Sequence, residues 1–301
     1  MDGNREGLIF QINSCAAHNE AGPHSFVFFK GCPLRCLWCG HPEAQGAGAG
    51  LLWDSERCQG CGQCLSACPG GALRVARDGD PELEPARCDG CGACADACAD
   101  EALQVMGRWF SVEQVLAEVP LAPRGRLTLS GGEPLAQPNF AAELLGRYKR
   151  EAPGGTTVLA TCGEAPWWHI EPLAADVDLF RYDLRHMDPA EHLRLTGRSN
   201  ERILENARRL AEEGHGLRLR LPLVPGVNDS LVNLAATAAF VRSLPGQDRL
   251  DLVPYRRAGV DHPQRLDRAA RRSPDPAFGP DRTGWARDFL ERQGLTVGMD
   301  G

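Results

Sequence analysis

Cysteines are concentrated in one part of this 301-residue chain. Of the thirteen, eleven fall between Cys32 and Cys98, and only Cys15 and Cys162 lie outside that window. The chain begins without the basic start or the apolar stretch of a signal peptide, and it has no run of about 18 apolar residues that could span a membrane. We therefore expect a cytoplasmic protein whose clustered thiols bind metal and do not pair as disulfides. The net charge of −7 gives no electrostatic reason to expect nucleic acid as a partner.

Two copies of one four-cysteine unit fill most of this window. They begin at Cys58 and Cys88, share the spacing C-x2-C-x2-C-x3-C, and resemble the runs of bacterial ferredoxins, in which the fourth cysteine of each run ligates the other cluster. Two zinc sites are the weaker alternative. Ala99 departs from the pattern, because a second Cys-Pro pair would be expected there. Crossed ligation predicts one [4Fe–4S] cluster on Cys58, Cys61, Cys64 and Cys98, and another on Cys88, Cys91, Cys94 and Cys68.

Three further cysteines, Cys32, Cys36 and Cys39, precede the repeat. Three thiolates can hold three irons of a [4Fe–4S] cube and leave the fourth iron open to a small molecule. A zinc knuckle is the alternative, but zinc usually takes four ligands and no fourth ligand pairs neatly here. The spacing C-x3-C-x2-C, with Trp38 just before the third cysteine, resembles the signature of the radical S-adenosylmethionine (SAM) superfamily.

Short β-rich runs alternate with helical patterns in the rest of the chain. This alternation predicts a parallel sheet with right-handed crossovers. Six units fit a partial (β/α)6 barrel of the TIM type, the α/β fold that the radical SAM resemblance implies, and a doubly wound open sheet is the alternative from periodicity alone. In either fold the chemistry belongs at the C-terminal ends of the strands. The expected strands are 25–30, 126–130, 156–161, 177–182, 217–224 and 250–253, and the expected helices lie near 111–119, 138–151, 165–175, 200–213 and 230–243.

This pattern predicts three segments. Residues 1–50 form the first part of the radical SAM core with the Cys32 loop. Residues 51–104 form an inserted ferredoxin-like module with two clusters, and residues 105–301 form the remainder of the partial barrel.

A glycine-rich motif follows the second expected strand. In Ser130-Gly131-Gly132-Glu133-Pro134 the glycines allow close approach of a backbone, and Glu133 could accept hydrogen bonds from an ammonium group. Beside the cysteine triad it resembles the radical SAM motif that binds the methionyl amine of SAM. The resemblance gives that role to Gly131, Gly132 and Glu133.

The resemblance narrows further to the activating enzymes of glycyl radical enzymes, over about Ile9 to Tyr255. It is carried by the stretches 28–43, 128–135, 182–188, 195–200 and 221–229. Family members with two extra ferredoxin-type clusters place them at this same position. The resemblance implies three [4Fe–4S] clusters, SAM, a flavodoxin or ferredoxin-type electron donor, and a glycyl radical enzyme as the protein partner. SAM would be split into methionine and a 5′-deoxyadenosyl radical, which takes a hydrogen atom from a glycine Cα of the partner. No catalytic residue is implied beyond the open cluster and SAM, and the cofactor-binding set extends to Trp38, Asp183 and Arg220.

Several positions depart from the family pattern. Ala160 stands where an acidic residue is usual, and that acid together with the counterpart of Asp183 helps to hold a monovalent cation in some members. The cation site is therefore left open in this chain. Arg185 replaces a usual lysine, Arg256 interrupts a usual Pro-Tyr-His run, and residues 18–24 differ from the usual upstream segment.

Two other functions remain as alternatives. One is a radical SAM enzyme of the same architecture that acts on a small molecule or a peptide. The other is an electron carrier built around the ferredoxin module, which would need neither the Cys32 triad nor Glu133. Among the remaining residues, Cys15 and Cys162 are expected to be ordinary packed thiols. Structural or solvated roles are expected for the histidines His41, His169, His186 and His215.

Overall fold

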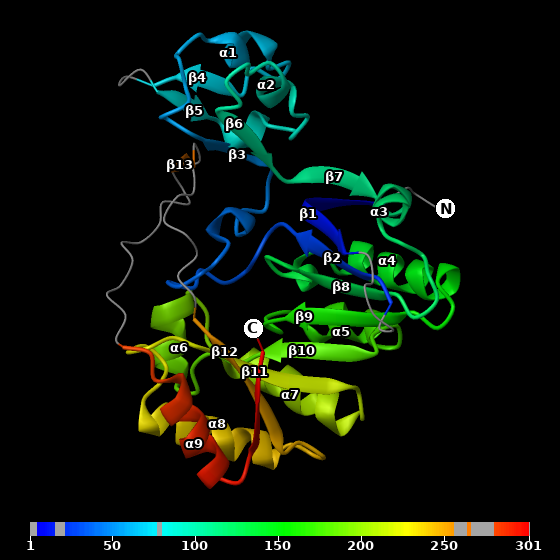
Figure 1. Cartoon of the computed structure of the whole chain (residues 1–301), viewed down its shortest axis with the longest axis vertical. Helices are drawn as coiled ribbons and strands as arrows, with labels where there is room; N and C mark the ends of the chain where they lie inside the picture. Colours follow the sequence, from blue (N-terminus) through cyan, green and yellow to red (C-terminus); the bar gives the residue numbers. More distant parts are fainter. Residues whose placement is uncertain (1–4, 16–21, 77–79, 256–263, 266–279, 301) are drawn as a thin grey trace.

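The computed structural model describes residues 5–15, 22–76, 80–255, 264–265 and 280–300 (Figure 1). Arg256 and residues 18–21 of the departing upstream segment lie outside this part of the chain.

Nine strands form the main sheet, in the order β14-β12-β11-β10-β9-β8-β2-β1-β7. From β2 to β12 the spatial order follows the chain without a reversal, and each neighbouring pair is parallel. A doubly wound sheet reverses its order at a switch point, so this topology excludes it and confirms the partial barrel. The six predicted strands are β2 (His24–Phe29), β8 (Arg126–Gly131), β9 (Thr156–Thr161), β10 (Leu179–Asp183), β11 (Leu217–Leu223) and β12 (Arg249–Pro254).

Three strands of the sheet were not predicted. β14 (Thr296–Met299) adds a seventh parallel strand beside β12, while β1 (Glu6–Cys15) and β7 (Arg108–Ser111) extend the other edge in antiparallel fashion. Among the described residues, β14 and β7 stay at opposite ends of the strand order, so the barrel is partial.

Helices cover one face of the sheet, in the crossovers between its parallel strands (Figure 1). Leu127, Leu129, Leu159, Phe180 and Leu219 are fully buried against this layer. Alternate strand residues therefore face the barrel interior. The expected helices are present as α3 (Val112–Glu118), α4 (Pro138–Glu151), α5 (Trp167–Ala174), α7 (Glu201–Glu212) and α8 (Leu231–Ser243). Additional helices are α6 (Pro189–Thr196) and α9 (Thr283–Arg292), with short 3-10 turns at Pro42–Ala44, Pro85–Arg87 and Pro134–Ala136.

The start of α3 is capped by two side chains. The Ser111 side chain accepts a hydrogen bond from the backbone of Gln114, and the Gln114 side chain accepts one from the backbone of Ser111. This capping box satisfies two backbone donors that a helix start would otherwise leave unpaired.

The inserted module has its own small architecture, above the barrel in Figure 1. It leaves the core through β3 (Gly50–Trp53) and returns through β6 (Leu103–Met106), which pair antiparallel with Gly50 opposite Met106. A short strand from the C-terminal half, β13 (Gln264–Arg265), pairs with the other edge of β3. Between β3 and β6 lie α1 (Gln63–Ala67), β4 (Leu73–Val75), β5 (Pro81–Leu83) and α2 (Ala93–Asp96).

None of the helices in the described residues is both long enough and apolar enough to cross a membrane.

Candidate functional site

The eight module cysteines line two separate cavities, and each cavity takes cysteines from both runs. The first cavity lies against Trp53 and Leu103, and the second lies against Leu51 and Val105. The pair Leu51 and Val105 is nearer to the Gly50–Met106 neck, so the second cavity is the one closer to the barrel. The first is lined by Cys58, Cys61, Cys64 and Cys98, and the second by Cys68, Cys88, Cys91 and Cys94, the two sets that crossed ligation predicts.

The donor set of each cavity suits an iron–sulfur cluster. Among the described residues, no three Cys, His, Asp or Glu side chains are grouped closely enough to hold a single metal ion. Backbone amides also point at ligand sulfurs: Ala72 N lies 3.2 Å from Cys68 Sγ, and Ala102 N lies 3.3 Å from Cys98 Sγ. Such N–H···S contacts tune iron–sulfur clusters.

The two runs fold alike despite the alanine at position 99. After each fourth cysteine the chain makes the same turn, with Gly71 N donating to Cys68 O at 3.1 Å and Glu101 N donating to Cys98 O at 3.0 Å. The turn places Gly71 at φ +55° and Glu101 at φ +49°, in the left-handed region that disfavours side chains. Ala99 is therefore tolerated, and the strain of the second turn falls on Glu101.

Replacing Glu101 with glycine is expected to stabilise the module by about 0.5–1 kcal/mol, because glycine adopts this φ without a Cβ penalty. The ion pair lost with Arg57 lies on the surface and contributes little. Anaerobic urea unfolding followed by the visible absorbance of the clusters measures the change. Glu56→Gly, at an exposed position with ordinary φ, is the matched control and should not stabilise. A Glu101→Gly protein no more stable than the unaltered protein would contradict the strain.

The loop that carries Cys32, Cys36 and Cys39 follows β2 at its C-terminal end. Its neck is closed by Gly31 N donating to Ala44 O at 2.7 Å, and its tip is anchored to the end of α6 by Arg35 N donating to Thr196 O at 2.7 Å. The loop is thus held at both ends by hydrogen bonds within the chain, which favours a fixed geometry of the three cysteines.

Trp38 contributes to the second anchor. The side chain is 7% exposed and packs with Leu195 of α6 and with Val224, just after β11. In the described structure Trp38 therefore fixes the loop to two elements of the barrel, and a contact with the cofactor stays a prediction.

Arg185 lies next to Cys36 of the cysteine triad. Burial raises the pKa of the Cys36 thiol to about 11. Burial alone would lower the pKa of the Arg185 guanidinium, but Cys36 and Asp183 outweigh it and raise that pKa. Arg185 also hydrogen-bonds to Cys36 and leaves its own Nε buried without a partner among the described residues. The arginine that replaces the usual lysine is therefore directed at the triad.

Cys162 was expected to be an ordinary packed thiol, and it is buried, but its location is more specific. A side-chain hydrogen bond joins it to Cys32, which lowers the pKa of Cys32 and raises that of Cys162. The two residues are 130 positions apart, and spacing could not have paired them. Cys15 is exposed at the end of β1, so the prediction of a packed thiol is wrong there.

The glycine motif at the end of β8 packs against the neck of this loop. Gly132 N donates to Phe29 O and Glu133 N donates to Gly31 O, both at 2.8 Å. Gly131 has φ +109°, and a Cβ there would lie 2.5 Å from Phe29 N. A Cβ on Gly132 would lie 2.7 Å from Ala44 O and would also overlap Gly31 O. Both glycines are thus required for the close approach of two backbone segments.

Glu133 is buried, and its carboxylate connects β8 to β9. Its Oε1 accepts hydrogen bonds from Leu135 N at 3.0 Å and Thr161 Oγ1 at 2.7 Å, and its Oε2 accepts one from Cys162 N at 2.8 Å. Burial raises the pKa of this carboxyl, against the opposing effect of these donors. The Cys162 side chain also hydrogen-bonds to this carboxylate, so four donors of the chain itself surround its acceptor positions.

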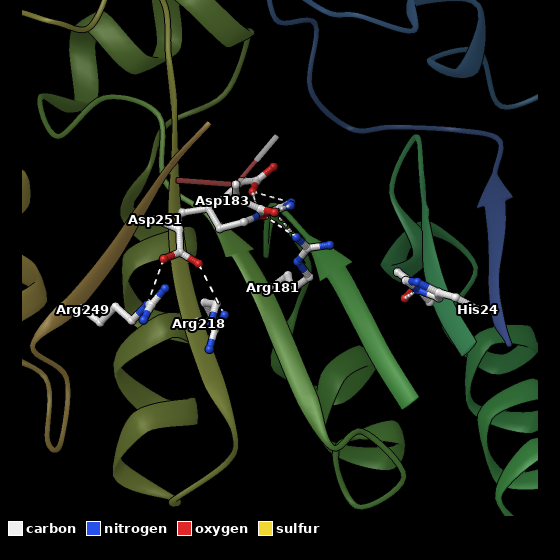
Figure 2. A network of polar contacts seen from close by, with 9 residues as sticks. His24, Arg181, Asp183, Arg218, Arg249 and Asp251 are labelled. Atoms are coloured by element: carbon white, nitrogen blue, oxygen red, sulfur yellow. Dashed lines mark hydrogen bonds and ion pairs between the residues drawn. The ribbon is translucent and has the colours of Figure 1, made fainter. Parts of the chain in front are cut away.

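Ion pairs gather on the interior side of β10 and β11 (Figure 2). Arg220 donates from Nε to Asp183 Oδ1 at 2.8 Å, and Arg185 Nη1 lies 3.6 Å from Asp183 Oδ2. Asp300, just after β14, pairs with both Arg220 and Arg181. Arg220 is only 15% exposed at its side chain and is therefore not a surface arginine.

Further from the triad, the interior carries a second group of charges. Asp251 pairs with Arg249 at 2.9 Å and with Arg218 at 3.7 Å (Figure 2). His24, on β2, hydrogen-bonds to Thr128 at 2.9 Å, and burial lowers its pKa. The interior of the barrel is therefore polar as well as partly open.

Two asparagines in the stretches 195–200 and 221–229 hydrogen-bond to the backbone around Arg185. Asn228 Nδ2 donates to Arg185 O at 3.0 Å, and Asn200 Nδ2 donates to Met187 O at 2.8 Å. Neither side chain is directed at the triad by these bonds. These hydrogen bonds hold the backbone at Arg185 and Met187 in place.

The four histidines singled out in the sequence have local partners or solvent. His41 lies 3.1 Å from Glu43, His215 lies 3.4 Å from Glu213, and His186 accepts a hydrogen bond from Asp188 N. His169 contacts the exposed Trp168.

Two family models match the sequence. The radical SAM superfamily matches residues 84–238, and a 4Fe-4S dicluster domain matches residues 50–99. The second match coincides with the module between β3 and β6.

Curated relatives share more than a third of their residues with this chain. The choline trimethylamine-lyase activating enzyme of Oleidesulfovibrio alaskensis is 39% identical over 272 residues, which cover 85% of this chain and 86% of that protein. The isethionate sulfite-lyase activating enzyme of Desulfovibrio desulfuricans is 38% identical, with 86% of each chain covered. The trans-4-hydroxy-L-proline dehydratase activating enzyme of Clostridioides difficile is 36% identical and covers 84% of this chain and 85% of that protein. A solved domain of a pyruvate-formate lyase-activating enzyme from Bacteroides vulgatus is 27% identical, with a TM-score of 0.46, and covers 58% of this chain and 98% of that domain.

Proposed function

The chain belongs to the activating enzymes of glycyl radical enzymes, within the radical SAM superfamily, and from this we propose that it installs a glycyl radical on a partner protein. The observation that carries the proposal is the identity of 34–39% over most of the chain to relatives that are all activating enzymes. The electron-carrier alternative does not account for that identity.

We assign the cofactors to residues as follows. Cys32, Cys36 and Cys39 would hold the open [4Fe–4S] cluster, and the two crossed cysteine sets of the module would hold two more. SAM would lie beside Gly131, Gly132, Glu133, Asp183, Arg220 and Trp38. The open cluster, with one electron from a flavodoxin or ferredoxin-type donor, would supply reductive cleavage of SAM, and the resulting 5′-deoxyadenosyl radical would take a hydrogen atom from a glycine Cα of the partner.

The protein's own residues prepare this site. Glu133 keeps the end of β8 fixed to β9, beside the place proposed for the ammonium group of SAM. Arg185 and Arg220 flank Asp183 at the carboxyl ends of β10 and β11, where the carboxylate of SAM can be paired. The anchored cysteine loop limits the movement of the ligands and helps to exclude water.

The test uses anaerobically reconstituted protein, SAM, a strong reductant and a short glycyl-loop peptide deuterated at the glycine Cα. Mass spectrometry of the 5′-deoxyadenosine product is expected to find deuterium in its methyl group. Unlabelled 5′-deoxyadenosine, from a peptide that is shown to bind, would instead favour a small molecule or another peptide as substrate. No 5′-deoxyadenosine at all, from protein with full iron content, would refute the proposed catalytic activity.

A further inference from the structure

The residues around Asp183 do not fit the monovalent cation that the family resemblance implies. Oδ1 of Asp183 accepts from Arg220 Nε at 2.8 Å and lies 2.7 Å from Arg220 Nη2, while Oδ2 faces Arg185 Nη1 at 3.6 Å. Both carboxylate oxygens thus already face guanidinium groups. A metal ion at this place would have to displace charge-assisted hydrogen bonds.

The second carboxylate of such a cation site is also missing. Ala160 holds that position on β9, and its register partner on β10 is Arg181. Arg181 is largely buried at 25% exposure and extends into the same interior space (Figure 2). A guanidinium therefore lies next to the position where an acid would help to bind a cation.

Asp300 supplies the balancing negative charge from the end of β14. Its Oδ2 lies 3.2 Å from Arg220 Nη1, it pairs with Arg181, and its backbone N donates to Leu252 O at 2.9 Å. Burial alone would raise the pKa of Asp300, but Arg181 and Arg220 outweigh it and hold that pKa below its usual range. The site then contains three guanidinium groups and two carboxylates. They belong to Arg181, Arg185, Arg220, Asp183 and Asp300. A further cation would be repelled by this net positive charge.

We propose that the SAM site of this chain works without a bound monovalent cation. Arg181 and Arg220 take the cation's place, and Asp300 is the positioning residue that holds both guanidiniums. The inference rests on the proposed function only in placing SAM beside Asp183. Its test measures SAM binding without a partner protein or glycine. The binding result can therefore be interpreted even if the chain does not abstract hydrogen from glycine.

The first experiment compares salts. SAM affinity of the anaerobically reconstituted full chain is measured by calorimetry at equal ionic strength in potassium, sodium and tetramethylammonium chloride. Tetramethylammonium is too bulky to sit between two carboxylates. The dissociation constant is expected to stay within about threefold across the three salts, since screening is the same in each. A larger loss in tetramethylammonium that added potassium reverses would overturn the proposal.

The second experiment tests Asp300. Asp300→Asn removes the charge shared by two partly buried arginines and is expected to weaken SAM binding about tenfold in every salt. Asp300→Glu should restore binding to within about threefold of the unaltered protein. The matched control is Asp288→Asn, at an exposed carboxylate on α9.

Thermal unfolding and module-cluster absorbance separate positioning from folding. If both are unchanged in Asp300→Asn while SAM binding weakens and Asp300→Glu recovers it, the positioning role holds. SAM binding by Asp300→Asn equal to that of the unaltered protein would disprove it.

Discussion

Replacing Cys36 with alanine is expected to abolish SAM cleavage while leaving the inserted module intact. If the chain holds the three proposed clusters, about four of about twelve irons should be lost, because one cube loses a ligand. The rate of 5′-deoxyadenosine formation should fall below about one thousandth of that of the unaltered protein, since no other group can supply the reaction. Iron analysis, electron paramagnetic resonance and product chromatography measure the three effects. The eight cysteines in the two module cavities should keep their clusters.

Two controls sharpen this result. Cys15→Ala removes an exposed thiol at the end of β1 and should change neither iron content nor SAM cleavage. Cys162, hydrogen-bonded to Cys32, is the thiol nearest in position to act as a substitute ligand. If Cys36→Ala kept the site cluster and the double variant with Cys162→Ala lost it, ligand exchange would explain the survival. Full activity in both variants would contradict the assignment of the triad.

Replacing Gly132 with alanine is the second change with a large expected effect. The new methyl group would meet Gly31 O and Ala44 O, two backbone atoms at the neck of the cysteine loop that cannot move independently. Overpacking of this kind typically costs about 1–3 kcal/mol, here concentrated on the geometry of one loop. We expect SAM affinity to fall about tenfold or more, with partial loss of the site cluster and normal module clusters.

Calorimetry with SAM and iron analysis under anaerobic conditions measure these losses. Gly284→Ala is the control, because a Cβ at that position on α9 has no neighbour within 4 Å. Unaltered SAM affinity and iron content in Gly132→Ala would show that the neck can open without consequence for the site.

The sequence predicted those features that are encoded locally. Apolar residues recur in each of the six predicted barrel strands, and the cysteines recur at spacings of two and three residues, so both patterns could be identified from the order of residues alone. The sorting of these cysteines into two cavities also agrees with the repeated pattern, and their role as cluster ligands stays a prediction. The start of α3 was equally local, since Ser111 and the residues after it carry the capping signal.

The features that sequence reasoning missed depend on contacts between distant segments. β14 has four residues, one of them Gly298, and only its pairing with β12 makes it a strand. Asp300 acquires its partners through that pairing. Cys162 and Cys32 meet because β9 and β2 flank β8, which no spacing rule can express. Trp38 was assigned to the cofactor from its motif, whereas its packing against Leu195 depends on where α6 ends.

The paired strands at the base of the module bear on how such a chain could acquire it. Because Gly50 and Met106 lie opposite one another on β3 and β6, the insertion begins and ends at neighbouring points of the barrel. Opposed residues of antiparallel strands lie only about 5 Å apart, a gap that a tight turn can close. A module inserted in this way can be gained, lost or exchanged between genes without changing the order or the connections of the barrel strands that hold the Cys32 loop. The pairing of β13 with β3 is the one contact with the C-terminal half, among the described strands, that such an exchange would have to replace.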